Sequence, residues 1–171
     1  RRMYPHSSVG EGQFMAALVR AGDGAALSSA LVPPAGERIP AFEAFWRETF
    51  ASEPPAAMLL PDGRVLLPPR LLPREWKGLH IVRAGVLAGE LKNGRFTPDH
   101  ALALAFPASA FHSTVPLEAE ALSRFLAGET VACAPSLSGW CPATVLGHPV
   151  GWGKAVEGTL KNHIPKGLRI R

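Results

Sequence analysis

The stretch G-W-G-K-A-V-E-G-T-L-K-N-H-I-P-K-G-L-R, residues 151–169, says most about the fold of this chain. It contains three lysines, an arginine, a histidine and an asparagine, interleaved with four glycines and a tryptophan, and Glu157 is its one acidic residue. Glycines let a backbone approach a bulky ligand, cations attract a polyanion, and an indole can stack on a base. The alternative is a solvated basic tail, but Trp152, Leu160 and Ile164 are unusual in a free tail.

Short strands surround this stretch. The apolar pattern and the Gly and Pro turns predict strands at residues 130–134, 140–146 and 150–156 and near Leu168, which is typical of a small β-barrel. A helix over residues 117–126, stopped at Gly128, precedes the strands. Within such a barrel, Trp152 is expected to be a core residue rather than a stacking platform.

Further upstream, the pattern predicts a mixed module. An amphipathic helix over residues 41–51 places an apolar stripe on one face, formed by Phe42, Phe45, Trp46, Thr49 and Phe50. Two hairpins follow, with Asp62-Gly63 and Asn93-Gly94 as their turns. Strands are also expected at residues 13–19 and 79–82, and a helix from Pro98 to Phe106 with Thr97 as its cap. The predicted fold class is therefore α+β.

Charge is distributed in blocks. The net charge of the 171 residues is +4, but residues 70–95 and residues 148–171 each carry +4, whereas residues 21–69 and 96–147 each carry −3. Two basic blocks that converge on one face form the electrostatic outline of a nucleic-acid binder. Alternation of this kind is also ordinary for a basic protein, so charge alone leaves both interpretations open.

The cysteines and the hydropathy of the sequence argue against a metal-binding, secreted or membrane-spanning protein. Cys133 and Cys141 do not have a metal-ligand spacing, and no metal site is expected. Two cysteines without a signal peptide favour a reducing cytoplasm, and no segment is apolar enough to predict a membrane span. Because the chain begins Arg1-Arg2, we expect it to be a piece of a longer protein.

Three stretches together resemble a known family. They are R-x-x-P-H-x-x-x-G-E-G-x-F at residues 2–14, R-A-G-x-x-x-G-x-x-x-x-x-R-F-x-P-x-H-A-L-A-L-A at residues 83–105, and the terminal stretch quoted first. In order and spacing they resemble the part after the catalytic fold of the Sun-type RNA cytosine-5 methyltransferases, RsmF branch, which modify ribosomal RNA. The resemblance covers nearly the whole chain and is weakest at residues 21–57.

The resemblance implies a domain organisation. Residues 1–20 would close a catalytic methyltransferase domain and residues 21–36 would be a linker. Residues 37–106 would form a small mixed α/β module, and residues 107–171 a PUA-like RNA-binding β-barrel. The family's catalytic cysteines lie in Pro-Cys and Thr-Cys contexts, and this chain has neither, nor a Gly-rich cofactor turn. We therefore expect no catalytic residue and no cofactor site here, with S-adenosylmethionine bound by the intact parent enzyme.

The predicted RNA-binding residues are cations and polar groups of the two basic blocks. Lysines and arginines would neutralise phosphates, and Asn162 and His163 would bond a 2′-hydroxyl or a base edge. Two alternatives stay open: Asn162 and His163 satisfying backbone groups in a tight turn, and the arginines pairing with Glu90 or Asp99. The predicted set is Arg83, Arg95, Lys154, Lys161, Asn162, His163, Lys166 and Arg169.

The function expected from these observations is RNA recognition. The chain would position ribosomal RNA for 5-methylcytosine formation by a catalytic domain that it lacks, as a cytoplasmic monomer. A free-standing RNA-binding protein is the alternative. A hydrolase is disfavoured, because Ser138-Gly139 does not form a nucleophile elbow.

Overall fold

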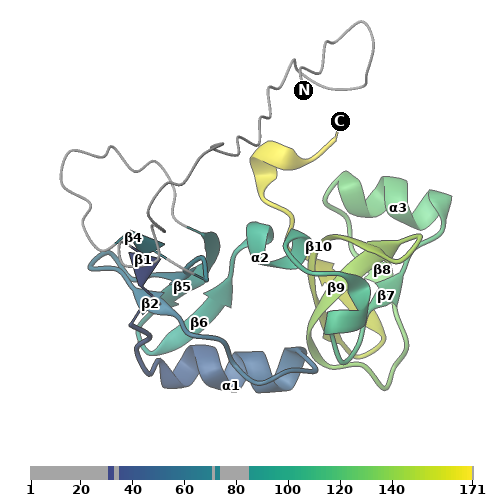
Figure 1. Cartoon of the computed structure of the whole chain (residues 1–171). Helices are drawn as coiled ribbons and strands as arrows, with labels where there is room; N and C mark the ends of the chain where they lie inside the picture. Colours follow the sequence, from purple (N-terminus) through teal and green to yellow (C-terminus); the bar gives the residue numbers. More distant parts are fainter. Residues whose placement is uncertain (1–30, 33–34, 71, 74–84, 171) are drawn as a thin grey trace, which may run out of the picture. The chain divides into compact units, whose positions relative to one another are not determined.

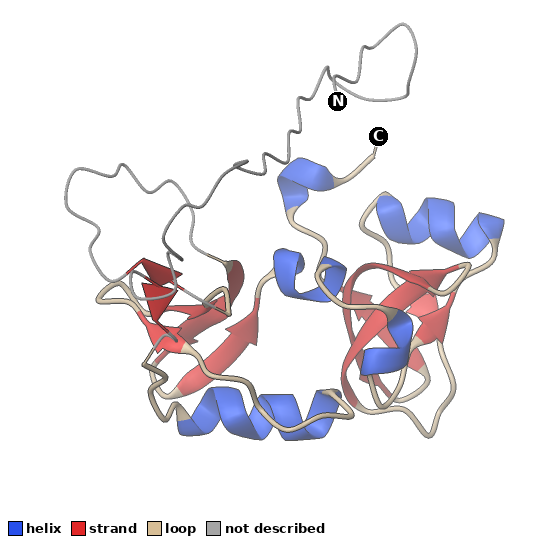
Figure 2. Ribbon diagram, in the orientation of Figure 1, coloured by secondary structure: helices blue, strands red, loops and turns tan. Residues whose placement is uncertain are grey.

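The computed structural model describes residues 31–32, 35–70, 72–73 and 85–170 (Figure 1). The predictions for residues 1–20, for the strand at 79–82 and for Arg83 lie outside the described residues. Within residues 31–171, which form one compact unit, the elements build two main sheets with helices beside them (Figure 2). The mixed α and β class is confirmed.

The first sheet is antiparallel and has four strands in the order β2-β3-β5-β6. The strands are β2 (Met58–Leu59), β3 (Arg64–Leu67), β5 (Val86–Lys92) and β6 (Arg95–Pro98). The two predicted hairpins are confirmed, because Asp62-Gly63 connects β2 to β3 and Asn93-Gly94 connects β5 to β6. A separate pair joins β1 (Leu31–Val32) to β4 (Leu72–Pro73), so part of the range predicted as a linker is a strand.

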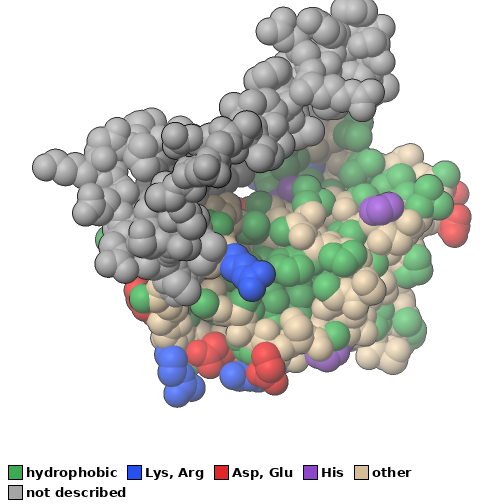
Figure 3. Space-filling model, viewed as in Figure 1, with side chains coloured by type: hydrophobic (Ala, Val, Ile, Leu, Met, Phe, Trp, Pro, Cys, Tyr) green, Lys and Arg blue, Asp and Glu red, His purple; other side chains and the backbone are tan. Residues whose placement is uncertain are grey.

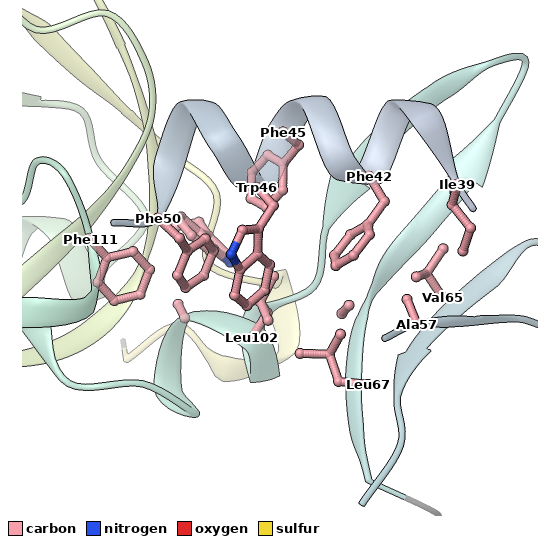
Figure 4. Close-up of a cluster of buried hydrophobic side chains, with 13 residues drawn as sticks. Ile39, Phe42, Phe45, Trp46, Phe50, Ala57, Val65, Leu67, Leu102 and Phe111 are labelled. Carbon is pink, nitrogen blue, oxygen red and sulfur yellow. The ribbon is translucent and has the colours of Figure 1, made fainter. Parts of the chain in front are cut away.

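Helix α1 (Pro40–Thr49) begins with proline in its first turn, where a missing N–H costs nothing. The predicted apolar stripe is confirmed, since Phe42, Phe45, Trp46 and Phe50 are all buried. Trp46 and Phe50 stack with ring centroids 3.8 Å apart. Figure 4 shows these rings along α1, together with side chains of the first sheet such as Val65 and Leu67. The helix therefore covers the sheet with aromatic side chains.

Helix α2 (His100–Leu104) begins later than the sequence predicts. Thr97 and Pro98 are the last residues of β6 and pair with Glu90 and Gly89, so Thr97 cannot cap a helix. The cap is Asp99, whose carboxylate accepts a hydrogen bond of 2.8 Å from the Ala101 N–H. Sheet pairing thus overrides a local start signal that favoured Thr97.

The second sheet has five strands in the order β7-β9-β10-β11-β8. It curls into a half-barrel, and in the described residues its edge strands β7 and β8 do not pair, so the barrel is not closed. Each edge strand has only two residues. Helix α3 (Ala119–Leu126) confirms the predicted second helix. The strands are β7 (Val115–Pro116), β8 (Val131–Ala132), β9 (Gly139–Val145), β10 (His148–Val156) and β11 (Thr159–Asn162).

Strand β11 corrects the expected final strand. The sequence predicts a strand near Leu168, but that residue lies in a short 3-10 helix, η3 (Lys166–Leu168), and the last strand is β11. A two-residue turn makes β11 possible, because Glu157 and Gly158 both have positive φ, 47° and 77°. This is the backbone of a type I′ hairpin turn, for which Glu-Gly is a weaker sequence signal than Asn-Gly.

Two hydrophobic clusters form the core. The first contains α1, the first sheet and α2, and it also takes in Phe111 and Trp152, which come from the second half of the chain. The second lies within the curled sheet and against α3. Trp152 is 1% exposed, which confirms it as a core residue, and its indole N–H donates to the Asp99 carbonyl at 2.9 Å. The curled sheet is therefore bound to the first module through β10.

Candidate nucleic-acid interface

A row of side chains crosses three strands of the curled sheet. Lys154 on β10 lies opposite Trp140 on β9 and opposite Lys161 on β11. Directly opposite residues of neighbouring strands project from the same face of a sheet. Lys154 and Lys161 are exposed and Trp140 is half-buried. We call Trp140, Lys154 and Lys161 the basic row.

The alternation of the strands explains why Lys154 and Lys161 lie outside the core of the curled sheet. Gly153 and Ala155, the neighbours of Lys154, are buried on the opposite face and belong to the inner side of the sheet, as does Leu160 beside Lys161. A Cβ atom at Gly153 would lie 2.4 Å from Leu160 Cγ, so only glycine permits this close packing. The inner face is thus apolar and tight, whereas the basic row lies on the outer face.

Two other rings pack against Trp140. His163 packs against it with centroids 4.5 Å apart and an interplanar angle of 64°, and Trp152 lies 6.2 Å away at 78°. Both arrangements are edge-to-face. The ammonium of Lys154 lies 5.8 Å from the centroid of the Trp140 ring, over the ring, which is a cation–π geometry.

The backbone N–H of His163 donates a hydrogen bond of 3.0 Å to the Trp152 carbonyl, and this bond fixes the position of the residue. Partial desolvation of the ring lowers the pKa of His163, and the nearby charge of Lys154 lowers it further. At neutral pH the imidazole is therefore uncharged, with one nitrogen that donates and one that accepts. The His163 ring therefore places an uncharged hydrogen-bond donor and acceptor beside Trp140.

The side-chain amide of Asn162 makes hydrogen bonds to other groups of the chain. Its Nδ2 donates to the Phe125 carbonyl at the end of α3, and its Oδ1 accepts a hydrogen bond of 2.9 Å from the Ile164 N–H. These bonds tie the segment after β11 to α3. They match the alternative in which this side chain satisfies backbone groups.

Arg169 also has internal partners. Its Nε donates to the Ile164 carbonyl at 3.1 Å, and its side chain lies against Gly128, where an added Cβ would approach it to 2.5 Å. Lys166, in η3, is exposed. The C-terminal segment thus presents Lys166 to solvent, while Arg169 is half-buried.

Arg95 lies elsewhere, on the first sheet, where it is exposed and opposite Lys92 next to the Asn93-Gly94 turn. The structure does not bring Arg95 into the basic row. Among the described residues, the ion pairs join Arg38 and Arg47 to Glu43, Arg64 to Asp62, and Arg124 to Glu129. None of them involves Arg95 or a lysine.

The visible face of the space-filling view carries few cations. In Figure 3, the Lys and Arg side chains that can be seen are separated from one another, and several of them lie beside Asp or Glu side chains. The part of the described surface that is visible in this view shows no continuous basic patch. A candidate interface therefore rests on the cross-strand register of the basic row rather than on a general excess of positive charge.

Trp140 is not among the site residues that the sequence predicts. The sequence places it at the start of a predicted strand, but nothing local says that it lies opposite Lys154. The signal that could have found it is the length of the β9–β10 hairpin, since the turn sets the register of a hairpin. A bulge between Pro149 and Gly151 shifts that register, which makes the pairing hard to count from sequence.

The described residues do not suggest chemistry of another kind. Burial raises the pKa of the Cys141 thiol and also that of Cys133, so neither is an activated nucleophile. No group of three or more His, Cys, Asp or Glu side chains in the described part of the chain could hold a metal ion. Among the same residues, no helix combines the length and apolar character needed to cross a membrane.

The curled five-stranded sheet with α3 beside it is consistent with a domain of the PUA type. Residues 112–170 match the family model described as the methyltransferase RsmF PUA domain, and residues 44–106 match that of the RsmF rRNA methyltransferase first C-terminal domain. The chain therefore belongs to the C-terminal region of RsmF-type rRNA cytosine-5 methyltransferases. A search of curated proteins found no match.

Proposed function

We propose that this chain positions ribosomal RNA for S-adenosylmethionine-dependent formation of 5-methylcytosine by a catalytic domain of a longer protein. The two matched domains are those of the RNA-binding part of an rRNA methyltransferase. In this proposal the chain contributes no catalytic group and no cofactor contact. Its role is to place a polyanion through phosphate contacts and local shape.

The observation that carries the proposal is the pairing of Lys154 with Lys161. Like charges directly opposite each other on neighbouring strands destabilise a sheet. None of the ion pairs among the described residues relieves this repulsion, and both side chains are exposed. Neighbouring phosphates of one RNA strand, each bound by one of the two ammonium groups, would offset this repulsion, so the arrangement favours an anionic ligand over none.

The other predicted residues among those described have different roles in this proposal. Lys166 extends the positive charge beyond β11, and Arg95 supplies a second, separate contact on the first sheet. His163 lies beside the basic row and offers uncharged hydrogen-bonding groups. Asn162 and Arg169 support the segment that carries Lys166 through the internal bonds described above.

The test is RNA binding as a function of salt. Each phosphate contact contributes roughly one unit to the slope of log K against log salt. We expect the double variant Lys154→Ala, Lys161→Ala to lose about two units of slope and to bind more weakly at low salt. Melting should change little, since surface substitutions usually alter stability by about 0.5 kcal/mol or less.

A charge-matched control separates specific contacts from net charge. The double variant Arg38→Gln, Arg124→Gln also removes two positive charges, but each arginine already pairs with a carboxylate. It should keep nearly the wild-type slope. Equal losses in the two double variants, or wild-type binding that does not respond to salt, would contradict the proposal.

A further inference from the structure

Trp140 differs from the other described tryptophans in the hydrogen bonding of its indole N–H. The indole N–H of Trp46 donates to the Ser52 carbonyl, and that of Trp152 donates to the Asp99 carbonyl. The indole N–H of Trp140 donates to no group among the described residues, and it is not one of their buried unpartnered atoms. Buried tryptophans usually satisfy this donor. Trp140 thus keeps a donor for an external partner.

No neighbouring ring among the described residues stacks in parallel on Trp140. His163 and Trp152 meet the ring at angles of 64° and 78°, which orients it without parallel stacking on either neighbour. The group over the ring is the ammonium of Lys154, at the end of a flexible and exposed side chain. Such a side chain can swing away at small cost, whereas a packed aromatic ring could not.

We propose that Trp140 is a stacking platform for an unpaired nucleotide, and that the RNA recognised by the basic row is single-stranded at this point. A base would replace Lys154 over the ring face, and the displaced ammonium would then reach the phosphate of the same nucleotide. Lys161, one strand further along the row, would take a neighbouring phosphate. Adjacent strands lie about 4.8 Å apart, so the row spans roughly 10 Å.

The choice of single-stranded RNA follows from the chemistry of the platform. In an RNA duplex the faces of the bases are covered by their neighbours, and proteins contact the duplex through phosphates and 2′-hydroxyls. An aromatic face next to cations instead matches a splayed base with its backbone, as in proteins that bind single strands. A loop, bulge or opened end of structured RNA supplies such a nucleotide. This inference rests on the proposed function.

The experiment titrates the full chain with two RNAs of equal length, one single-stranded and one fully paired. We expect Trp140→Ala to weaken single-stranded binding roughly tenfold or more, the loss typical of one stacked base. Duplex binding and its salt slope should stay unchanged. Trp140→Phe should recover most of the affinity, and Trp140→Leu, which keeps apolar volume without an aromatic face, should not.

Fluorescence gives a measurement that does not depend on a weakened variant. Single-stranded RNA should quench part of the indole emission of the wild-type chain, and Trp140→Phe should lose that quenching while still binding. The inference is overturned if Trp140→Leu binds single strands within about twofold of wild type while remaining folded in a melting experiment, or if duplex and single-stranded affinities fall together. Wild-type chain that binds neither RNA would instead refute the proposed function itself.

Discussion

The two hydrophobic clusters of this molecule are built from different side chains. The first is dominated by aromatic rings, whereas the second consists mainly of small and aliphatic groups with Phe125 as its one buried ring. Large rings let a short helix and a small sheet bury much apolar area with few residues. Small residues let strands β9, β10 and β11 curl tightly. A thin core therefore supports the curled sheet, whose outer face carries the basic row.

Trp152 connects the two kinds of packing. It comes from β10 of the curled sheet, yet its ring lies in the aromatic cluster, 5.8 Å from Phe45 and 5.7 Å from Phe111. The inner face of the same strand carries Gly153 and Ala155. Strand β10 thus contributes side chains to both hydrophobic clusters. Substitutions on this strand can therefore test each cluster separately.

The largest expected effect comes from Trp152→Ala. Removing a fully buried tryptophan typically costs about 3–5 kcal/mol, and here it also deletes the hydrogen bond to the Asp99 carbonyl. Chemical denaturation should show one transition shifted to much lower denaturant. Two separate transitions, with only one of them shifted, would mean that the clusters are not coupled through this ring.

Gly153→Ala should have the next largest effect. The added methyl would lie 2.4 Å from Leu160 Cγ in the tight second cluster, and overpacking of this kind costs about 1–3 kcal/mol. Gly167→Ala is the matched control, because nothing lies within 4 Å of its added Cβ. Thermal melting of both variants checks the prediction, and equal stabilities would show that the inner face is looser than described.

Asn162→Ala should lower stability by about 1–3 kcal/mol, because the Phe125 carbonyl and the Ile164 N–H would both lose a partner. RNA affinity, measured under conditions where the variant is folded, should then fall less than it does for Lys161→Ala. Calorimetric melting and RNA titration on the same samples measure both quantities. A folded Asn162→Ala variant of full stability that fails to bind RNA would make this amide a direct contact.

The smallest expected effect is a pH dependence of stability. Burial lowers the pKa of His100, with Asp99 partly opposing it, and the pKa of His163 is lowered as well. Below the ordinary histidine pKa of about 6.5, the unfolded chain binds more protons than the folded one, so the free energy of unfolding falls as pH falls. Above that pH the contribution is fully present.

Urea unfolding between pH 5 and 8 measures this dependence, and His100→Gln should flatten it. The ring of His100 lies against Gly151 of β10, and its Nδ1 is buried without a hydrogen-bond partner among the described residues. Protonation at this contact between α2 and β10 therefore has an unfavourable environment. An unchanged or steeper dependence in the variant would assign the effect to other groups.

Local chemistry in the sequence determined a large part of the first module. The period of the aromatic residues in α1 and the turns at Asp62-Gly63 and Asn93-Gly94 act over a few residues, so the predictions there hold in the structure. The basic character of residues 151–169 and their resemblance to a known family were also apparent without coordinates. These features depend on neighbours in the chain, which a sequence displays directly.

Tertiary structure alone decided which side chains meet. Pairing of β6 with β5 took Thr97 out of the helix start, and the Glu157-Gly158 turn made a strand of residues 159–162. The register of β9, β10 and β11, shifted by a bulge, then placed Lys154 between Trp140 and Lys161. Sheet register reflects the packing of a whole face, because a slip by one residue would turn every side chain to the other side. No short stretch of sequence contains the information on how a whole face of the sheet packs.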